Sequence, residues 1–315
     1  MRATRTAEAS PAGTGTEGEM AGAGGESRGI WLALVAYAVL FAALIAAYAA
    51  TSMVVLLAEA FDTLSDVVFS GFLLLSFRLS QRPADEEHMY GHGRVQNVGA
   101  LVAAMIFILF LSLETFRQAI PELLHPAVEE APSVAIGIAV TVLGLLLTIA
   151  PFAATLRTRT GGAAARAQFV ALVENLGAYV VALVGLVLVA NGVAWAGAVS
   201  SIVIGVLILV SGLYLLKENA DVLVGRAPPR DFLEKIRATA LGVPGVLGIH
   251  DIRAEYVGPG AVSAGFHIEV AGGTPVEEAD RIAEEVHARV ARTTGCLYCV
   301  VHVDPPCDPR GEKPG

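Results

Sequence analysis

The sequence predicts a membrane protein made of six apolar helices and followed by a small α+β domain in the aqueous phase. Two observations lead to this fold class. Hydrophobic residues make up 55% of the 315 residues and charged residues only 16%, whereas soluble domains average about 25% charged residues. Long uncharged segments alternate with short charged ones up to about residue 218, and beyond it the charge pattern becomes that of a soluble domain.

The chain divides into four predicted regions. Residues 1–28 are rich in Gly, Ala, Ser, Thr and Glu and lack an apolar block, which favours a disordered tail over a signal peptide. The membrane domain covers residues 29–218, the second domain covers 219–308, and 309–315 form a C-terminal tail. Because a bilayer span needs about 20 apolar residues, we expect six spans, at 29–49, 53–79, 95–119, 133–156, 166–191 and 195–216.

Basic residues assign the two sides of the membrane. The loops after the second and fourth spans, and the segment after the sixth, carry Arg and Lys, but the opposite loops have almost none. The positive-inside rule therefore places both termini in the cytoplasm, and we expect a multi-pass protein of the plasma membrane. The net charge of −9 argues against a nucleic acid as a partner.

The second domain is predicted to have the element order αββαβ. Residues 230–241 form an amphipathic helix, and alternating apolar residues over 246–258 and 261–272 predict two strands. A second helix follows, with Thr274 as its expected N-cap and Glu277 completing a capping box, and then a third strand. This order gives a small sheet with helices on one face, like part of the ferredoxin-like, metallochaperone-like motif. About 80 residues bury only a modest core, so dimerisation is expected.

Two carboxylates lie deep in the predicted second span. Asp62 and Asp66 are four residues apart, so a helix places them on one face, with Glu59 on the same stripe. At about 1.5 Å per residue they lie about 13 Å and 19 Å from the start of the helix, near the middle of the bilayer. Each costs roughly 2.5–3.5 kcal/mol there. The pair therefore either stays protonated and hydrogen-bonded, binds a divalent cation in exchange for protons, or takes part in proton or organic-solute coupling.

The stretch FDTLSD at 61–66, followed by RPADEEHMYGHGR at 82–94, resembles the cation diffusion facilitator family of metal/proton antiporters. The resemblance covers about residues 29–308 and implies a homodimer with cytoplasmic termini and a cytoplasmic metal-binding domain. It implies efflux of a divalent metal by alternating access, with protons as counter-ion. Zn²⁺ is the first candidate metal, and Mn²⁺, Fe²⁺ and Co²⁺ are the others. Asp62 and Asp66 would be the core of the transport site.

Two other functions are compatible with acidic residues in a membrane span. A membrane metal sensor, or a partner subunit that does not transport, is the alternative. An intramembrane aspartyl protease is not expected, because its two carboxylates normally come from different helices, and here both lie on one. We therefore expect no enzyme.

The fifth span departs from the pattern that the resemblance implies. The family usually supplies a histidine and an acid from this span, but these positions here hold Ala171 and Asn175. Glu174 lies one residue earlier, about 100° around the helix. Asn175 offers a neutral oxygen, which is a weaker zinc ligand than a carboxylate or an imidazole. Three alternatives stay open: an oxygen-rich site for a harder ion such as Mn²⁺ or Fe²⁺, a register that turns Glu174 inward, or a weakened site.

The loop after the second span has the residue types of a metal site. Asp85, His88 and His92 offer one carboxylate and two imidazoles at spacings of three and four. The resemblance implies a metal site at these positions. The alternative is a solvated loop whose histidines only carry charge near the lipid headgroups.

Ligand types also lie on the three predicted strands of the second domain. His250 lies on the first strand and His267 on the second, while His302 and Asp304 share one face of the third. The resemblance implies a metal site here at the dimer interface, with Asp280 in place of a family histidine. The alternative for each histidine is surface or core packing.

All three cysteines lie near the C-terminus, at Cys296, Cys299 and Cys307. An odd, clustered set is not typical of a disulfide framework. A single CxxC is a weak zinc signal, so reduced thiols that pack or act as auxiliary ligands are expected.

Overall fold

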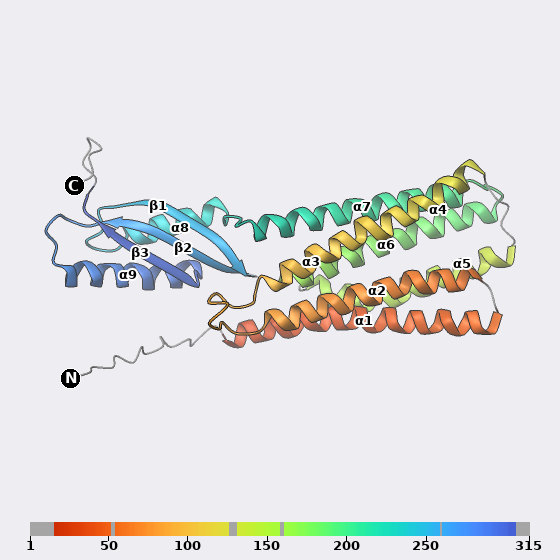
Figure 1. The fold of residues 1–315 in the computed structure, drawn as a ribbon, viewed down its shortest axis with the longest axis horizontal. Helices are drawn as coiled ribbons and strands as arrows, with labels where there is room; N and C mark the ends of the chain where they lie inside the picture. Colours follow the sequence, from red (N-terminus) through yellow and green to blue (C-terminus); the bar gives the residue numbers. More distant parts are fainter. Residues whose placement is uncertain (1–15, 52–53, 126–130, 158–160, 259, 307–315) are drawn as a thin grey trace. The chain divides into compact units, whose positions relative to one another are not determined.

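The structure is a computed structural model that describes residues 16–51, 54–125, 131–157, 161–258 and 260–306; the side chains of 16–24, 51, 54–59, 62 and 131–133 are outside this description. Within the described residues, six helical spans precede a domain with a three-stranded sheet (Figure 1), which confirms the predicted fold class. Cys307 and the predicted tail at 309–315 lie outside the described residues.

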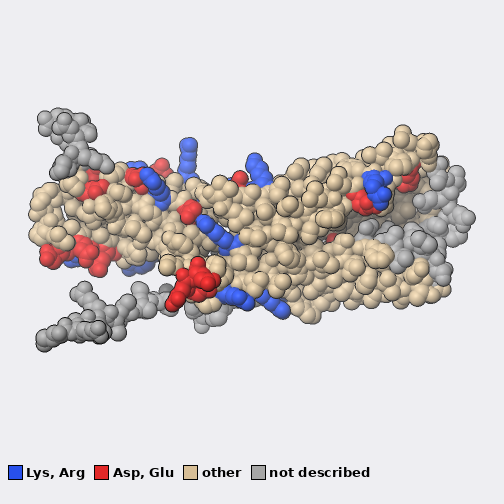
Figure 2. All heavy atoms as spheres, in the orientation of Figure 1, with Lys and Arg blue, Asp and Glu red and all other residues tan. Residues whose placement is uncertain are grey.

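The six spans have apolar outer surfaces. Large apolar side chains such as Phe110, Leu146 and Val210 are exposed on them, as helices that face lipid require. Figure 2 shows a long surface of uncharged atoms over the helices, while charged side chains gather over the second domain. The elements that make up the spans are α1 (Thr16–Thr51), α2 (Val54–Ser80), α3 (Val95–Ile106), η1 (Phe107–Ser112), α4 (Leu113–Leu124), α5 (Ala131–Leu156), α6 (Ala163–Ala190) and α7 (Ala196–Leu223).

Two features of the spans differ from the sequence-based expectation. Helix α1 begins at Thr16, inside the region expected to be a disordered tail, where Ala, Glu and Met favour a helix. The third span is not one continuous α-helix, because the π-helical turn η1 separates α3 from α4. The π turn contains neither Gly nor Pro, so local sequence rules did not predict it.

The chain forms two compact units. The first contains α1, most of α2 and α6, the whole of α4 and α5, and the first part of α7. In this unit α1 packs against three helices: Leu40 and Leu44 contact α2 and α5, and Tyr37 packs with Leu172 of α6. The second unit contains the end of α2, α3, most of η1, the larger part of α7 from Leu209 on, and the α+β domain.

The α+β domain has the predicted element order. Helix α8 (Arg230–Leu241) is followed by strands β1 (Gly248–Gly258) and β2 (Ala261–Glu269), helix α9 (Val276–Thr294) and strand β3 (Tyr298–Asp304). The sheet order is β1-β2-β3, with β1 and β2 antiparallel. Strand β3 runs parallel to β2, because α9 carries the chain back across the sheet.

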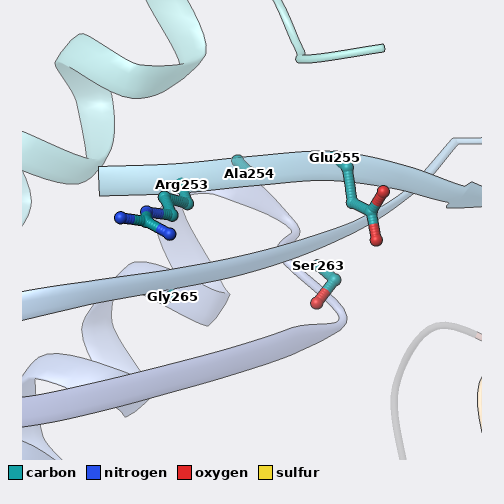
Figure 3. A pocket seen from close by; sticks show the side chains of 5 residues that line it. All are labelled: Arg253, Ala254, Glu255, Ser263 and Gly265. Atoms are coloured by element: carbon teal, nitrogen blue, oxygen red, sulfur yellow. The ribbon is translucent and has the colours of Figure 1, made fainter. Parts of the chain in front are cut away.

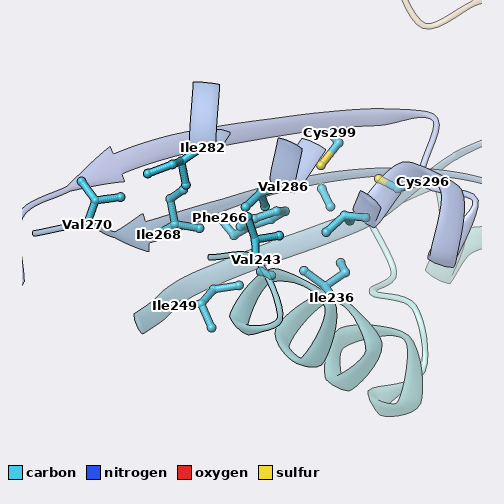
Figure 4. Close-up of a cluster of buried hydrophobic side chains, with 13 residues drawn as sticks. Ile236, Val243, Ile249, Phe266, Ile268, Val270, Ile282, Val286, Cys296 and Cys299 are labelled. Carbon is cyan, nitrogen blue, oxygen red and sulfur yellow. The ribbon is translucent and has the colours of Figure 1, made fainter. Parts of the chain in front are cut away.

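The core of this domain lies between the helices and one face of the sheet. Along β2, Ala264, Phe266 and Ile268 are buried against the helices, while the residues between them are more exposed on the other face. Ile236 of α8 and Val286 of α9 close the core from the helix side (Figure 4). The strand alternation therefore leaves one open sheet face.

The predicted capping box of the second helix is wrong. Helix α9 begins at Val276 after Pro275, and no side chain caps it. The hydroxyl of Thr274 instead donates backwards to the Ala271 carbonyl at 2.7 Å, and Thr274 lies one residue before the cap position, which Pro275 occupies. The preceding turn satisfies this hydroxyl locally.

Candidate metal sites

The first candidate site lies in the first unit, between α2 and α6. Asp66 is half-buried on α2, and Glu174 of α6 is 7% exposed. The two carboxyl groups are electrostatic neighbours. The side chains of Glu59 and Asp62 lie outside the described residues. Of the three alternatives for the fifth span, an inward-facing Glu174 agrees best with this arrangement.

Asn175 has a defined partner in the first span. Its side-chain nitrogen donates to the hydroxyl of Tyr37 at 2.8 Å. Tyr37 is 3% exposed, and Asp66, Tyr179 and Glu174 are its electrostatic neighbours. Ala171, at the position of the family histidine, is buried and offers no ligand. No local sequence pattern indicates Tyr37, because the contact depends on how α1 packs against α6.

The second candidate site is the loop between α2 and α3. One ligand atom from each of Asp85, His88 and His92 lies within 4.8 Å of the others. The Asp85 carboxylate accepts the backbone N–H of His88 at 2.7 Å and that of Glu87 at 3.1 Å, which folds the loop around it. The pKa of Asp85 is lowered, mainly by the hydrogen bond from the backbone of His88 and further by the side chains of His88 and His92. This carboxylate therefore stays ionised.

His92 is oriented for a ligand by a backbone carbonyl. Its Nδ1 lies 3.2 Å from the Pro83 oxygen. A carbonyl oxygen only accepts, so Nδ1 carries a hydrogen, and in the neutral ring the lone pair is then on Nε2. That Nε2 lies 3.6 Å from Asp85. This is how metal-ligating histidines are usually held.

The same loop contacts the α+β domain within the second unit. Arg94 donates to the Tyr256 carbonyl at 2.8 Å and lies 3.2 Å from the Glu255 carboxylate. The ring of Tyr90 meets that of Tyr298 edge to face, with centroids 4.8 Å apart. The loop cluster is therefore attached to the open face of the sheet.

The third candidate site lies on the open sheet face. The strand register places His250, His267 and His302 directly opposite one another on β1, β2 and β3. Their ring centroids are 5.2 Å and 4.6 Å apart. A bulge follows His250 in β1, with Asp251 at a φ of 48°. Bulges of this kind re-aim neighbouring side chains.

Asp304 connects the three histidines. Its carboxylate lies 2.8 Å from His267, 3.1 Å from His302 and 3.5 Å from His250. The hydrogen bond from His267, followed by the charges of His302 and His250, lowers the pKa of Asp304. Ligand atoms of His250, His267 and Asp304 lie within 4.8 Å of one another. Nε2 of His250 is buried without a hydrogen-bond partner among the described residues, so these residues fit a bound cation.

Two expected ligands are placed differently from this triad. His302 contacts Asp304 but its side chain is 63% exposed, at the edge of the cluster. Asp280 is exposed on α9, which packs against the opposite face of the sheet, so it does not reach the histidines of its own chain. Sequence reasoning missed Glu269, whose carboxylate lies 3.8 Å from His250. Glu269 is two residues after His267, so strand alternation places both on one face.

The cysteine pair belongs to the core. Cys296 and Cys299 are free thiols, 4% and 8% exposed, at the edge of the buried cluster (Figure 4). The thiol of Cys299 donates to Cys296, which lowers the pKa of Cys296 to about 7 and raises that of Cys299. Both cysteines are thus reduced and packed in the core, as the sequence predicted for them.

A shallow hollow on the open sheet face carries no ligand chemistry of its own. Figure 3 shows the residues that line it. Arg253 is held by Asp251 at 3.1 Å, and Glu255 is held by Arg94, so neither charge is left for a ligand in the hollow. The remaining lining residues are Ala254, Ser263 and Gly265.

The chain is similar to known transporters over most of its length. Residues 30–224 match the cation efflux transmembrane domain, and residues 228–306 match the cytoplasmic domain of cation efflux proteins. The cation-efflux pump FieF of Citrobacter koseri is 33% identical over 262 residues, which cover 81% of this chain and 84% of the pump. A transporter of Methanocaldococcus jannaschii is 27% identical over 253 residues, covering 80% and 89%.

Among solved structures, the C-terminal domain of MamM is 31% identical, with a TM-score of 0.24 over 24% of this chain and 98% of that domain. The match to the cytoplasmic family model supports dimerisation through this domain. Six apolar spans and two family models that together cover most of the sequence lead to one conclusion. The chain belongs to the cation diffusion facilitator family and is a multi-pass membrane protein of metal cation efflux.

Proposed function

We propose that this protein exports a divalent transition metal in exchange for protons, by alternating access. The observation that carries the proposal is the pair of neighbouring carboxyl groups, Asp66 and Glu174, on two different spans. Two such groups in a poorly solvated site stay ionised together only if a cation neutralises them. When the metal leaves, protons can take its place, so the two cargoes compete for the same oxygens.

The transport site consists of Asp62 and Asp66 from α2 and Glu174 and Asn175 from α6. This set is rich in oxygen and has no imidazole, because Ala171 replaces the family histidine. Zn²⁺ is the first candidate cargo, and Mn²⁺, Fe²⁺ and Co²⁺ are the others.

The two other clusters have supporting roles. The loop cluster of Asp85, His88 and His92 captures metal on the cytoplasmic side. The sheet cluster, His250, His267 and Asp304 with His302 at its edge, binds metal where the two subunits of the homodimer meet. Both termini lie in the cytoplasm and the protein resides in the plasma membrane, as the distribution of Arg and Lys indicates.

Purified protein in vesicles with an imposed pH gradient tests the proposal. Uptake of Zn²⁺, Mn²⁺, Fe²⁺ and Co²⁺ is measured together with the internal pH, for the wild-type protein and Asp66→Asn. We expect metal uptake with proton counterflow in the wild type and neither in the variant. Metal binding without proton counterflow would contradict antiport and favour the membrane sensor, which the missing histidine at Ala171 makes the second candidate.

A further inference from the structure

Tyr37 connects the first span to the candidate transport site. Between residues 29 and 51 of α1 the side chains are almost all apolar. The ring of Tyr37 packs in this apolar surface, with Ala33, Leu172 and Val67 around it. Its hydroxyl is the part that meets polar groups: it accepts from Asn175 at 2.8 Å. A buried hydroxyl in a membrane span needs such a partner.

The hydrogen bond decides which end of the Asn175 amide is left for a cation. An amide has one oxygen that can bind a metal and one NH₂ group that repels it. The NH₂ group of Asn175 is held by Tyr37, so the oxygen is the end left for other contacts. Without the hydroxyl, the amide can turn over and offer its NH₂ group to the cation instead.

The position of Tyr37 relative to the acids extends this argument. Asp66 and Glu174 are both electrostatic neighbours of the phenol. A hydroxyl that accepts from Asn175 still has its own hydrogen to donate, and a carboxylate is the strongest acceptor available. Tyr37 therefore has the neutral ligand as its hydrogen-bond partner and the two acids as electrostatic neighbours.

We propose that Tyr37 is a positioning residue of the transport site, which holds Asn175 with its oxygen toward the transported cation. This inference rests on the proposed function. It makes the first span, which has no ligand of its own, a determinant of cation affinity. Partners that orient ligands typically contribute 10–100-fold, as an order of magnitude, in metal affinity or activity.

The substitution Tyr37→Phe tests this role, because it removes only the hydroxyl and keeps the packed ring. Uptake of Zn²⁺ and Mn²⁺ is measured in vesicles at several metal concentrations. We expect KM to rise about tenfold or more, with a smaller change in kcat. Tyr48→Phe is the matched control on the same helix, since Tyr48 packs against the apolar cluster that α1 forms with α2 and α5. Its KM should equal that of the wild type.

A second background separates positioning from packing. In Asn175→Asp the two carboxylate oxygens are equivalent, so no orienting partner is needed, and adding Tyr37→Phe should leave KM unchanged. An equal loss of affinity in both backgrounds, or no loss in either, would overturn the inference. If the wild-type protein takes up no metal, the proposed function fails as well. If it does and Tyr37→Phe behaves like the wild type, only the role of Tyr37 fails.

Discussion

Phe266 is the side chain on which the stability of the cytoplasmic domain depends most clearly. It is 1% exposed at the centre of the cluster between the sheet and α8 and α9. Truncating such a ring to alanine costs about 3–5 kcal/mol, whereas whole domains are stable by only about 5–15 kcal/mol. A domain of this size loses about 4–8 °C in melting temperature per kcal/mol. We therefore expect Phe266→Ala to melt roughly 12–40 °C below the wild type.

The cysteines provide an assay for this domain in the full-length protein. All three lie in or just after it, so a fluorogenic thiol reagent reports its unfolding and not that of the membrane helices. With Cys307→Ser, only the buried Cys296 and Cys299 remain to be labelled on heating. Val276→Ala is the matched control, because Val276 is 80% exposed. If Phe266→Ala and Val276→Ala melt at the same temperature, the core is not where the structure places it.

Three further predictions address the sites and the packing of the spans. Metal at about 100 times its Kd should stabilise the wild-type domain by roughly 2.7 kcal/mol and so raise its melting temperature in the thiol assay. In His267→Ala, most of this metal-dependent rise should be lost. In Gly185→Val, the new Cβ would overlap the Ser200 hydroxyl and lie 2.7 Å from the Ser200 Cβ, so we expect little monodisperse protein by size-exclusion chromatography, whereas Gly177→Ala should be tolerated because its nearest contact is 3.7 Å. Because the pKa of Asp304 is lowered from 3.8 in the folded state, its contribution is present above that value and lost as the pH falls through the folded-state pKa; in chelator-treated protein, Asp304→Asn should melt lower at neutral pH and show a smaller loss on acidification.

The sequence predicted what repeats along the chain. Long apolar segments located the six spans, and a period of two located the strands, which is why His302 and Asp304 were placed correctly on one face of β3. The same rule would have added Glu269, two residues after His267, to the open face. Local sequence patterns do not predict contacts between distant segments, such as the hydrogen bond between Tyr37 and Asn175, which are 138 residues apart. The failed capping box shows the limit at short range, since Pro275 and not Thr274 occupies the cap position of α9.

The difference in donor chemistry between the clusters has a consequence for transport. The loop and sheet clusters each combine a carboxylate with two imidazoles, a set that suits zinc and its neighbours in the transition series. The candidate membrane site has carboxylates and one amide, which bind such ions less tightly at the same pH. A transport site must release its cargo as well as bind it, so weaker binding there is compatible with turnover, while the loop and sheet clusters can hold metal for longer. We therefore expect the wild-type protein to show two classes of zinc affinity. The tighter class should lose part of its sites in His267→Ala or in His92→Ala and all of them when the two are combined, and the weaker class should be lost in Asp66→Asn. A single affinity class that all three substitutions weaken equally would refute this division of roles.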